Sequence, residues 1–439
     1  MYWHCLSAKF ESIQHHYLCC VLFLNGICIK MSKILFFFSL LALSHCQNNE
    51  VRSNQPSIPG DKNKVQETIT NLQSDVTSKN KNVDEPCTAD NAEAGVCVPF
   101  YLCNHNRTNI MDTSGLGIID IAVNDAPCES YLDTCCTVSN RRDPADPIIP
   151  LSTEKQRDGC GWRNPQGVLG FQTRGGEDEA KFAEFPWMVA ILKIDPVNAS
   201  DENGQQLKVY IGGGCLIHPS VVLTTAHFVA KANKLIVRAG EWDTQTTKEI
   251  YPYQDRDVGS MEIHKDFDGG KLFYDIALLF LTKPMNLAPN VGVACLPPPK
   301  QKASPGTRCF ATGWGKDKFG KEGRYQVILK KVELPVVEPK QCRDSLRKTR
   351  LGKLFELHST FMCAGGIGKD TCKGDSGAPL SCPIEYQENR YVQNGMVAWG
   401  IGCGEDGTPG VYVDVSVLRN WIDDKVAGKG YDPAVYSRY

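Results

Sequence analysis

The chain has 439 residues, of which 42% are hydrophobic, enough for two or three domains with sizeable cores. Its 48 lysine and arginine residues nearly balance 50 acidic residues, and the formal net charge is -2. This balance argues against nucleic acid or an anionic membrane as the main partner, so we expect protein partners.

The N-terminus predicts an export signal behind an extra segment. Met31 is followed by an apolar run, Ile34 to Leu43, and then by Ser44-His45-Cys46, which has small residues at the two positions that a signal peptidase reads. We therefore expect a signal peptide at 31–46, an upstream extension or misassigned start at 1–30, and an extracellular protein with no membrane span. A signal anchor is the alternative, although the apolar core is short for a bilayer.

The next two segments are a predicted leader and a cysteine-rich module. Residues 47–86 are polar with few aromatics, which predicts a flexible leader. Residues 87–136 hold six cysteines in a span too small for a large core, which favours a disulfide module. Zinc binding is the competing reading, but the adjacent pair Cys135-Cys136 suits two separate bridges better than a tetrahedral site. We expect no metal and no cofactor.

Residues 137–159 carry several prolines and basic residues and predict an extended, protease-accessible linker. From Cys160 onward, short apolar runs alternate with turns rich in glycine, proline and aspartate, which favours an all-β barrel. The clearest runs are Trp187–Leu192, Val221–Thr225 and Ile276–Leu281, and Val415–Val426 is the one convincing helix. Asn106 and Asn198 begin candidate glycosylation tripeptides.

Three segments of this β-rich region carry the residues of nucleophilic catalysis. His227 follows an apolar strand, Asp275 precedes another, and Ser376 lies in Gly374-Asp375-Ser376-Gly377. A serine hydroxyl needs a histidine base and an orienting carboxylate, and all three side chains occur here in recognisable contexts. Each residue alone would usually be structural, so the weight lies in the three contexts and their order.

On these motifs, residues 160–430 resemble a chymotrypsin-like serine protease domain, and residues 87–136 resemble an arthropod clip domain. The resemblance implies an all-β fold of two six-stranded barrels with a C-terminal helix, a small disulfide-rich clip domain before it and a short tail at 431–439. It makes His227 the general base, Asp275 its orienting acid and Ser376 the nucleophile.

The resemblance also implies how a substrate would be held. The N–H groups of Gly374 and Ser376 would stabilise the oxyanion, and such a donor typically contributes about a hundred- to thousandfold in rate. Asp370 matches the acid at the floor of a trypsin-like pocket with Trp399, Gly400 and Gly410 around it. The implied preference is therefore cleavage after arginine or lysine.

The resemblance further implies seven disulfides. They are Cys87-Cys135, Cys97-Cys128, Cys103-Cys136, Cys160-Cys295, Cys309-Cys382, Cys342-Cys363 and Cys372-Cys403. Removal of the chain through Cys46 would leave fifteen cysteines, so Cys215 is the one without a partner in this set. We expect it to be a buried apolar residue, with an intermolecular disulfide as the alternative.

Two departures from the family pattern affect the histidine. Active members carry a cysteine after the histidine and a partner on the preceding strand, whereas this chain has Phe228 and Gly212. We expect the missing bridge to loosen the histidine loop without abolishing chemistry. Ala398 stands where the family usually has a serine that hydrogen-bonds the triad acid, a second mild defect.

The graver departure concerns activation. In the family, a cut after arginine or lysine creates an isoleucine or valine N-terminus whose ammonium pairs with the acid before the nucleophile, here Asp375. This chain has Gln172 at the expected cut and Thr173-Arg174 in place of the apolar pair. A cut after Arg174 would expose a glycine without an apolar anchor. Asp375 would then lack a counter-charge.

These features suggest three functional hypotheses. The first is a secreted regulator in haemolymph with weak or no catalysis, as the resemblance to clip-domain serine protease homologues of arthropods implies. Its partners would be cascade proteases and prophenoloxidase or other protein substrates, and it could oligomerise after processing. The second is an active trypsin-like endopeptidase, because His227, Asp275, Ser376 and Asp370 all survive. In the third, the clip module recruits a partner or a microbial surface while the barrels serve as a scaffold.

Overall fold

The computed structural model describes the clip module in part and most of the chain after residue 158. Side chains are described for 85–88, 93–99, 102–103, 128, 133–141, 158–168, 176–196, 206–247, 249–318, 322–368, 370–403 and 407–437. Strand assignments alone are described for 23–24, 27–28, 118–119 and 172–173. The predicted signal peptide at 31–46, Arg174, Asn106 and Asn198 lie outside the described residues.

The chain divides into two compact units, Met1–Asn82 and Val83–Tyr439. In the first unit, β1 (Phe23–Leu24) pairs with β2 (Ile27–Cys28). Within the described residues, no helix has both the length and the apolar character that crossing a membrane would require.

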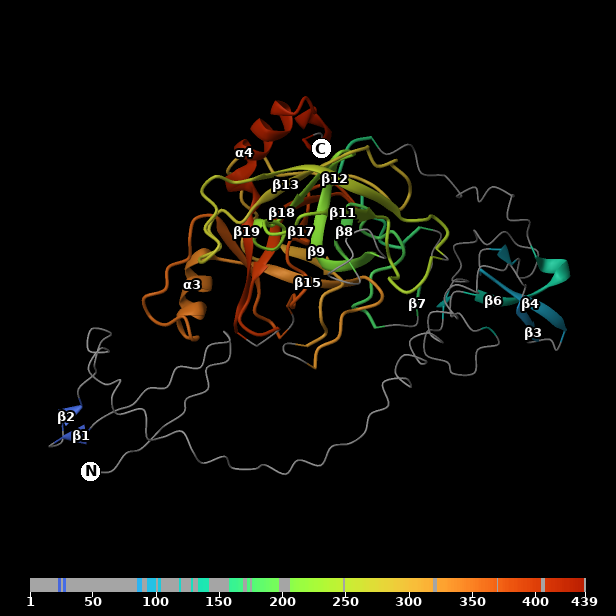
Figure 1. Cartoon of the computed structure of the whole chain (residues 1–439), viewed down its shortest axis with the longest axis horizontal. Coiled ribbons are helices and arrows are strands. Elements are labelled where there is room, and N and C mark those ends of the chain that lie inside the picture. Colours follow the sequence, from blue (N-terminus) through green and yellow to red (C-terminus); the bar gives the residue numbers. More distant parts are fainter. Residues whose placement is uncertain are drawn as a thin grey trace, which may run out of the picture. The chain divides into compact units, whose positions relative to one another are not determined.

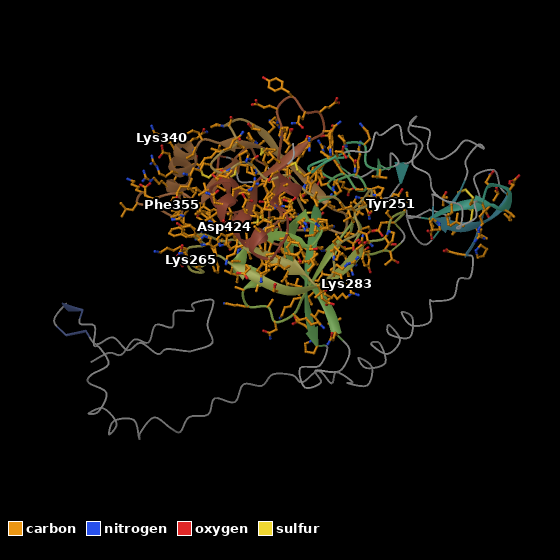
Figure 2. The ribbon with its side chains drawn as sticks, turned by 90° about the horizontal axis from the view of Figure 1, so that it is seen from above. Tyr251, Lys265, Lys283, Lys340, Phe355 and Asp424 are labelled. Carbon is orange, nitrogen blue, oxygen red and sulfur yellow. A yellow bond between two sulfur atoms is a disulfide. The ribbon has the colours of Figure 1, made fainter. Side chains whose placement is uncertain are left out.

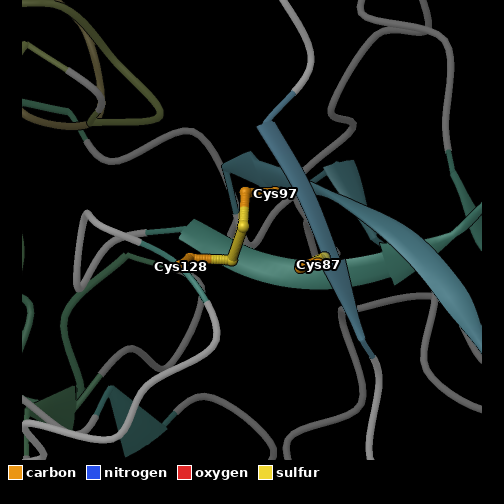
Figure 3. A group of neighbouring side chains, drawn as sticks. All are labelled: Cys87, Cys97 and Cys128. Atoms are coloured by element: carbon orange, nitrogen blue, oxygen red, sulfur yellow. A yellow bond between two sulfur atoms is a disulfide. The ribbon is translucent and has the colours of Figure 1, made fainter. Parts of the chain in front are cut away.

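The cysteine-rich module contains a three-stranded antiparallel sheet in the order β3-β4-β6. Its elements are β3 (Glu85–Thr88), β4 (Ala94–Pro99), β6 (Asp133–Thr137) and a 3₁₀ helix at Val138–Asn140. Figure 3 shows the Cys97–Cys128 disulfide beside Cys87, whose own partner is Cys135. Three of these sulfur atoms lie within 4.8 Å of one another, but each belongs to a disulfide and none is a thiolate ligand for zinc.

The first closed barrel has the strand order β10-β13-β12-β11-β8-β9. Its strands are β8 (Met188–Pro196), β9 (Gln206–His218), β10 (Val221–Thr224), β11 (Leu235–Ala239), β12 (Gln254–Ile263) and β13 (Ala277–Leu281). The apolar runs that predicted strands form β8, β10 and β13 with small shifts at their ends. Every residue of β10 and β13 is buried, which explains why these two strands read as continuous apolar runs.

The second closed barrel has the order β14-β15-β16-β19-β18-β17. Its strands are β14 (Arg308–Gly313), β15 (Lys330–Val337), β16 (Phe361–Gly365), β17 (Pro379–Pro383), β18 (Tyr391–Trp399) and β19 (Pro409–Asp414). Figure 1 shows these strands beside those of the first barrel, with α3 and α4 outside them. The predicted all-β fold of two six-stranded barrels is confirmed.

Helices occupy the connections and the C-terminal end. They are α2 (Ala226–Val229), α3 (Pro339–Arg347) and α4 (Val415–Gly428). The last begins at the predicted residue because the Asp414 side chain caps Ser416 N–H, and it continues two residues past the predicted end. In the predicted tail, a 3₁₀ helix at Pro433–Tyr436 buries Tyr436 completely, so this segment is packed into the domain. Another short strand, β7 (Gln172–Thr173), runs parallel to β5 (Ile118–Ile119).

A buried ion network fixes the start of the protease-like region. Glu184 is fully buried and binds the guanidinium of Arg163 and, at 2.8 Å, the ammonium of Lys331. The Arg163 guanidinium also lies 4.1 Å from the centre of the Phe310 ring. Two cations and one carboxylate thereby join the segment after Cys160 to the second barrel.

We predict that Glu184→Gln lowers the free energy of unfolding by about 3 kcal/mol, because it leaves two cations without their buried partner. Glu333→Gln is the matched control: Glu333 pairs with Arg308 at 2.7 Å on the surface, and its loss should cost no more than about 1 kcal/mol. Urea unfolding of the two variants measures the difference. Equal losses would contradict the role given to Glu184.

Candidate active site

The imidazole of His227 is held by the carboxylate of Asp275. The two residues lie at the same edge of the first barrel because β10 and β13 are antiparallel neighbours. Asp275 is fully buried. Its Oδ2 lies 2.6 Å from His227 Nδ1, and its Oδ1 accepts a 2.8 Å hydrogen bond from the His227 backbone N–H. A proton on Nδ1 leaves a lone pair on Nε2, which is the form that a general base needs.

The orientation of the Asp275 carboxylate depends on hydrogen bonds from His227. Within the described part of the chain, both hydrogen bonds that it accepts come from His227. Ala398 is buried and supplies a methyl group where the resemblance led us to expect a hydroxyl. The acid is therefore oriented by fewer donors than in the family pattern.

The backbone that leads to Asp275 is strained. Leu272 has φ 59° and Tyr274 has φ 52°, in the left-handed region that bulky residues rarely adopt. Such residues cost on the order of 1–3 kcal/mol each, so the surrounding structure must hold them. The ring of His264 stacks on Tyr274 with centroids 4.7 Å apart and supplies part of that support.

Ser376 lies in the loop before β17 and is attached to the first barrel through its backbone. Its carbonyl accepts a 2.9 Å hydrogen bond from Gly213 N–H of β9. Among the described residues, its hydroxyl makes no hydrogen bond to His227. Catalytic hydrogen bonds are often long before substrate binds. The structure therefore joins His227 to Asp275 directly and brings only the Ser376 backbone to the first barrel.

The two peptides that would supply the oxyanion donors are fixed by their carbonyl oxygens. Lys373 C=O accepts a 2.8 Å hydrogen bond from Lys316 N–H, and Asp375 C=O accepts a 2.9 Å bond from Ala378 N–H. In a planar trans peptide the N–H points away from the C=O, so these bonds also set the directions of Gly374 N–H and Ser376 N–H. Within the described residues, neither N–H donates to another protein group.

Tyr210 of β9 is a residue of this site that the sequence did not single out. Its hydroxyl donates a 2.9 Å hydrogen bond to Gly374 C=O, and its ring meets Tyr325 edge-on at 6.0 Å. Gly374 has φ 104°, and a methyl group there would lie 2.6 Å from the Tyr325 ring. Glycine is therefore required on both conformational and steric grounds. The sequence feature that could have identified Tyr210 is its position two residues before Gly212, on the strand next to the histidine loop.

The carboxylate of Asp375 is buried and is held by two backbone amides. Gly315 N–H donates to Oδ1 at 2.8 Å, and Cys372 N–H donates to Oδ2 at 2.9 Å. Burial raises the pKa of Asp375 to about 6, although the two amides oppose this shift. Within the described residues no cationic group pairs with it. Gln172 and Thr173, the residues at the expected cut, lie in β7.

Asp370, Gly400 and Gly410, which the resemblance assigned to a pocket for a cation, lie close together. A methyl group added at Gly410 would lie 2.6 Å from Asp370 Oδ1, and one at Gly400 would lie 3.9 Å from Oδ2. Asp370 accepts hydrogen bonds from Thr371 N–H at 2.8 Å and from Tyr412 at 3.5 Å. Burial raises the pKa of Asp370 to about 6. A guanidinium or ammonium would relieve this cost by stabilising the charged form.

The ring of Phe228 occupies the space beside Gly212 where the family bridge would lie. A methyl group at Gly212 would lie 2.7 Å from this ring and 2.8 Å from Ser376 C=O. One at Gly377 would also lie 2.9 Å from the ring. The Phe228 and His227 rings meet edge-on at 5.5 Å. Packing therefore braces the histidine loop that we expected to be loose.

The structure contains the same seven cysteine pairs that the resemblance implied. They are Cys87-Cys135, Cys97-Cys128, Cys103-Cys136, Cys160-Cys295, Cys309-Cys382, Cys342-Cys363 and Cys372-Cys403. Cys215 is a free cysteine and is fully buried. Burial raises the pKa of its thiol well above the usual value, which favours the neutral apolar form.

Comparison with known proteins matches both parts of the chain. A family model described as Trypsin matches residues 174–422, and one described as Serine protease Clip domain PPAF-2 matches residues 84–137. Phenoloxidase-activating factor 2 of Galleria mellonella is 71% identical over 302 residues, which cover 68% of this chain and 99% of that protein.

Two mosquito proteins are also similar to this chain. Inactive CLIP domain-containing serine protease A28 of Anopheles gambiae is 38% identical over 352 residues. Inactive CLIP domain-containing serine protease A8 of the same species is 35% identical over 337 residues. Each alignment covers 76% of this chain and 89% of the relative.

We predict that p-aminobenzamidine binds more tightly as the pH rises through about 6, because its cation needs ionised Asp370. Below that pH, the affinity should fall by up to about tenfold per pH unit. Fluorescence titration between about pH 4.5 and 8 measures the profile. Asp370→Asn should bind weakly at every pH, and a flat wild-type profile would contradict the assignment.

We also predict that Gly212→Ala lowers the free energy of unfolding by about 1–3 kcal/mol, because the methyl group would overlap Phe228. Gly428→Ala is the control: a methyl group there has no atom within 4 Å, and alanine suits a helix. The double variant Gly212→Cys with Phe228→Cys should form a disulfide that mass spectrometry detects. A Gly212→Ala protein as stable as the wild type would contradict the packing argument.

Proposed function

Because the chain belongs to the clip-domain family of trypsin-like serine proteases, we propose that it is a secreted regulator in a phenoloxidase-activating cascade. It binds arginine- or lysine-bearing segments of cascade proteases or of prophenoloxidase in the Asp370 pocket and cleaves them weakly or not at all. The name of the Galleria relative supports the cascade, and the names of the Anopheles relatives support weak catalysis.

The observation that carries this proposal is the buried Asp375 carboxylate together with the segment Gln172-Thr173-Arg174. No cation among the described residues pairs with the carboxylate, and a cut at this segment would create no apolar N-terminus to supply one. Its folded pKa of about 6 is higher than that of an exposed aspartate. The neutral carboxyl therefore contributes stability at low pH, and this contribution is lost as the pH rises through about 6.

This electrostatic cost affects the catalytic loop. Above about pH 6, Asp375 is a buried anion with no cationic partner among the described residues, which is a costly state. The loop that carries Ser376 and both oxyanion donors is attached to that anion. Cation binding by Asp370 uses a different carboxylate, whose charged form a bound guanidinium or ammonium would stabilise. Binding without efficient turnover is the outcome that these charges favour.

An active trypsin-like endopeptidase is the second candidate. It is favoured by the 2.6 Å contact between His227 and Asp275 and by the N–H groups of Gly374 and Ser376, which donate to no protein group within the described residues. In that case His227 would take the Ser376 proton as the hydroxyl attacks a carbonyl, and the two N–H groups would stabilise the resulting oxyanion.

We predict that the processed protein hydrolyses an arginine peptide ester at least about a thousandfold more slowly than trypsin does, as expected when the oxyanion site is not maintained. N-terminal sequencing of the same sample locates the cut, and titration with an organophosphonate counts reactive serines. Ser376→Ala is the control for contaminating protease. A trypsin-like rate that disappears in Ser376→Ala would replace the first candidate with the second.

A further inference from the structure

A basic loop, residues 348–354, borders the candidate substrate site. It follows α3, and its two ends are joined because Arg347 Nε donates a 2.8 Å hydrogen bond to Phe355 C=O. The Phe355 ring meets Trp399 edge-on with centroids 6.1 Å apart. Trp399 directly precedes Gly400, which adjoins Asp370. The loop is therefore packed beside the residues that surround Asp370.

Among the described residues, the cations of the loop have no acidic partners. Lys348, Arg350 and Lys353 are exposed, and none forms an ion pair within the described part of the chain. The acids on either side are already used: Asp344 pairs with Arg343 and Arg347, and Glu356 pairs with the same two arginines. Glu338 caps α3 through Gln341 N–H. Three positive charges thus remain for a partner on a chain whose net charge is -2.

One leucine of this segment also faces solvent. Leu354 is 95% exposed, whereas Leu351, Phe355 and Leu357 pack against the core. An exposed leucine beside uncompensated cations is suited to a partner that has both carboxylates and an apolar side chain. A protein segment has both, whereas a sulfated polysaccharide has only the charges. The observations therefore favour an acidic peptide.

We propose that the basic loop binds acidic residues, with an apolar neighbour, that precede the arginine or lysine held by Asp370. This inference rests on the proposed function, in which the pocket holds a segment of a partner protein. The loop selects among partners that share the basic anchor, because opposite charges at its rim raise the affinity for the matching segment. Phe355 and Trp399 hold the loop where such a segment would leave the pocket.

Two fluorescent peptides test the preference on the full chain carrying Ser376→Ala, which prevents turnover. The first has glutamate, leucine and aspartate before two glycines and a C-terminal arginine amide, and the second has glutamine, leucine and asparagine at the matching positions. We expect the acidic peptide to bind about tenfold more tightly at low salt, and the difference to shrink to about twofold in half-molar salt.

Charge reversal identifies the loop as the source. Lys348→Glu with Arg350→Glu and Lys353→Glu should abolish the preference, and Leu354→Ser should weaken both peptides several-fold. Lys283→Glu is the matched control, because Lys283 is also exposed and unpaired in the described structure, and it lies well apart from Lys340 and Phe355 in Figure 2. It should leave the preference unchanged.

The controls separate failure of this inference from failure of the proposed function. If p-aminobenzamidine binds at Asp370 but the two peptides bind equally, the inference is wrong and the pocket stands. If p-aminobenzamidine does not bind but the charge preference is present and lost in the triple variant, the loop assignment stands and the pocket function fails. Competition by a heparin oligosaccharide, together with no effect of Leu354→Ser, would assign the loop to a polysaccharide and overturn the inference.

Discussion

The buried carboxylate of Asp375 is the constraint on which the candidate site depends. It accepts from Gly315 and Cys372, and so ties the loop that carries Ser376 to the second barrel. Both oxyanion peptides belong to this loop, and so does Gly374, which Tyr210 holds from the first barrel. Backbone amides can orient a carboxylate, but they do not neutralise it. The loop is therefore well placed and electrostatically costly at the same time.

The histidine loop is likewise held by weaker interactions than those of the family pattern. A ring against two glycines stands where the family has a disulfide, and Asp275 is oriented by His227 alone among the described residues. Packing of this kind fixes the mean position of a side chain but adds no covalent limit on its motion. Ligand recognition tolerates that freedom better than catalysis, because reacting groups lose rate with small displacements.

Several parts of the fold and the site could be predicted because they are local or carried by motifs. The apolar runs that became β8, β10 and β13 are buried strands, and the helix after Asp414 begins with its cap. The motifs singled out His227 and Asp275, which the structure joins directly, and Ser376, whose backbone it attaches to the first barrel. Packing of Tyr436 was not predictable in the same way, because its burial depends on a hydrogen bond to Asp423 and contacts with distant strands.

By itself, the sequence determined which groups are present for a site: the histidine, the three aspartates, the serine and the cysteines that pair. It also showed the unusual residues Gln172, Phe228 and Ala398. Only the tertiary structure showed which contacts replace the missing family disulfide and which groups hold the Asp375 carboxylate. Phe228 fills the space beside Gly212 once the first barrel has folded, and Gly315 N–H, 60 residues from Asp375 in the chain, holds its carboxylate only in the folded second barrel.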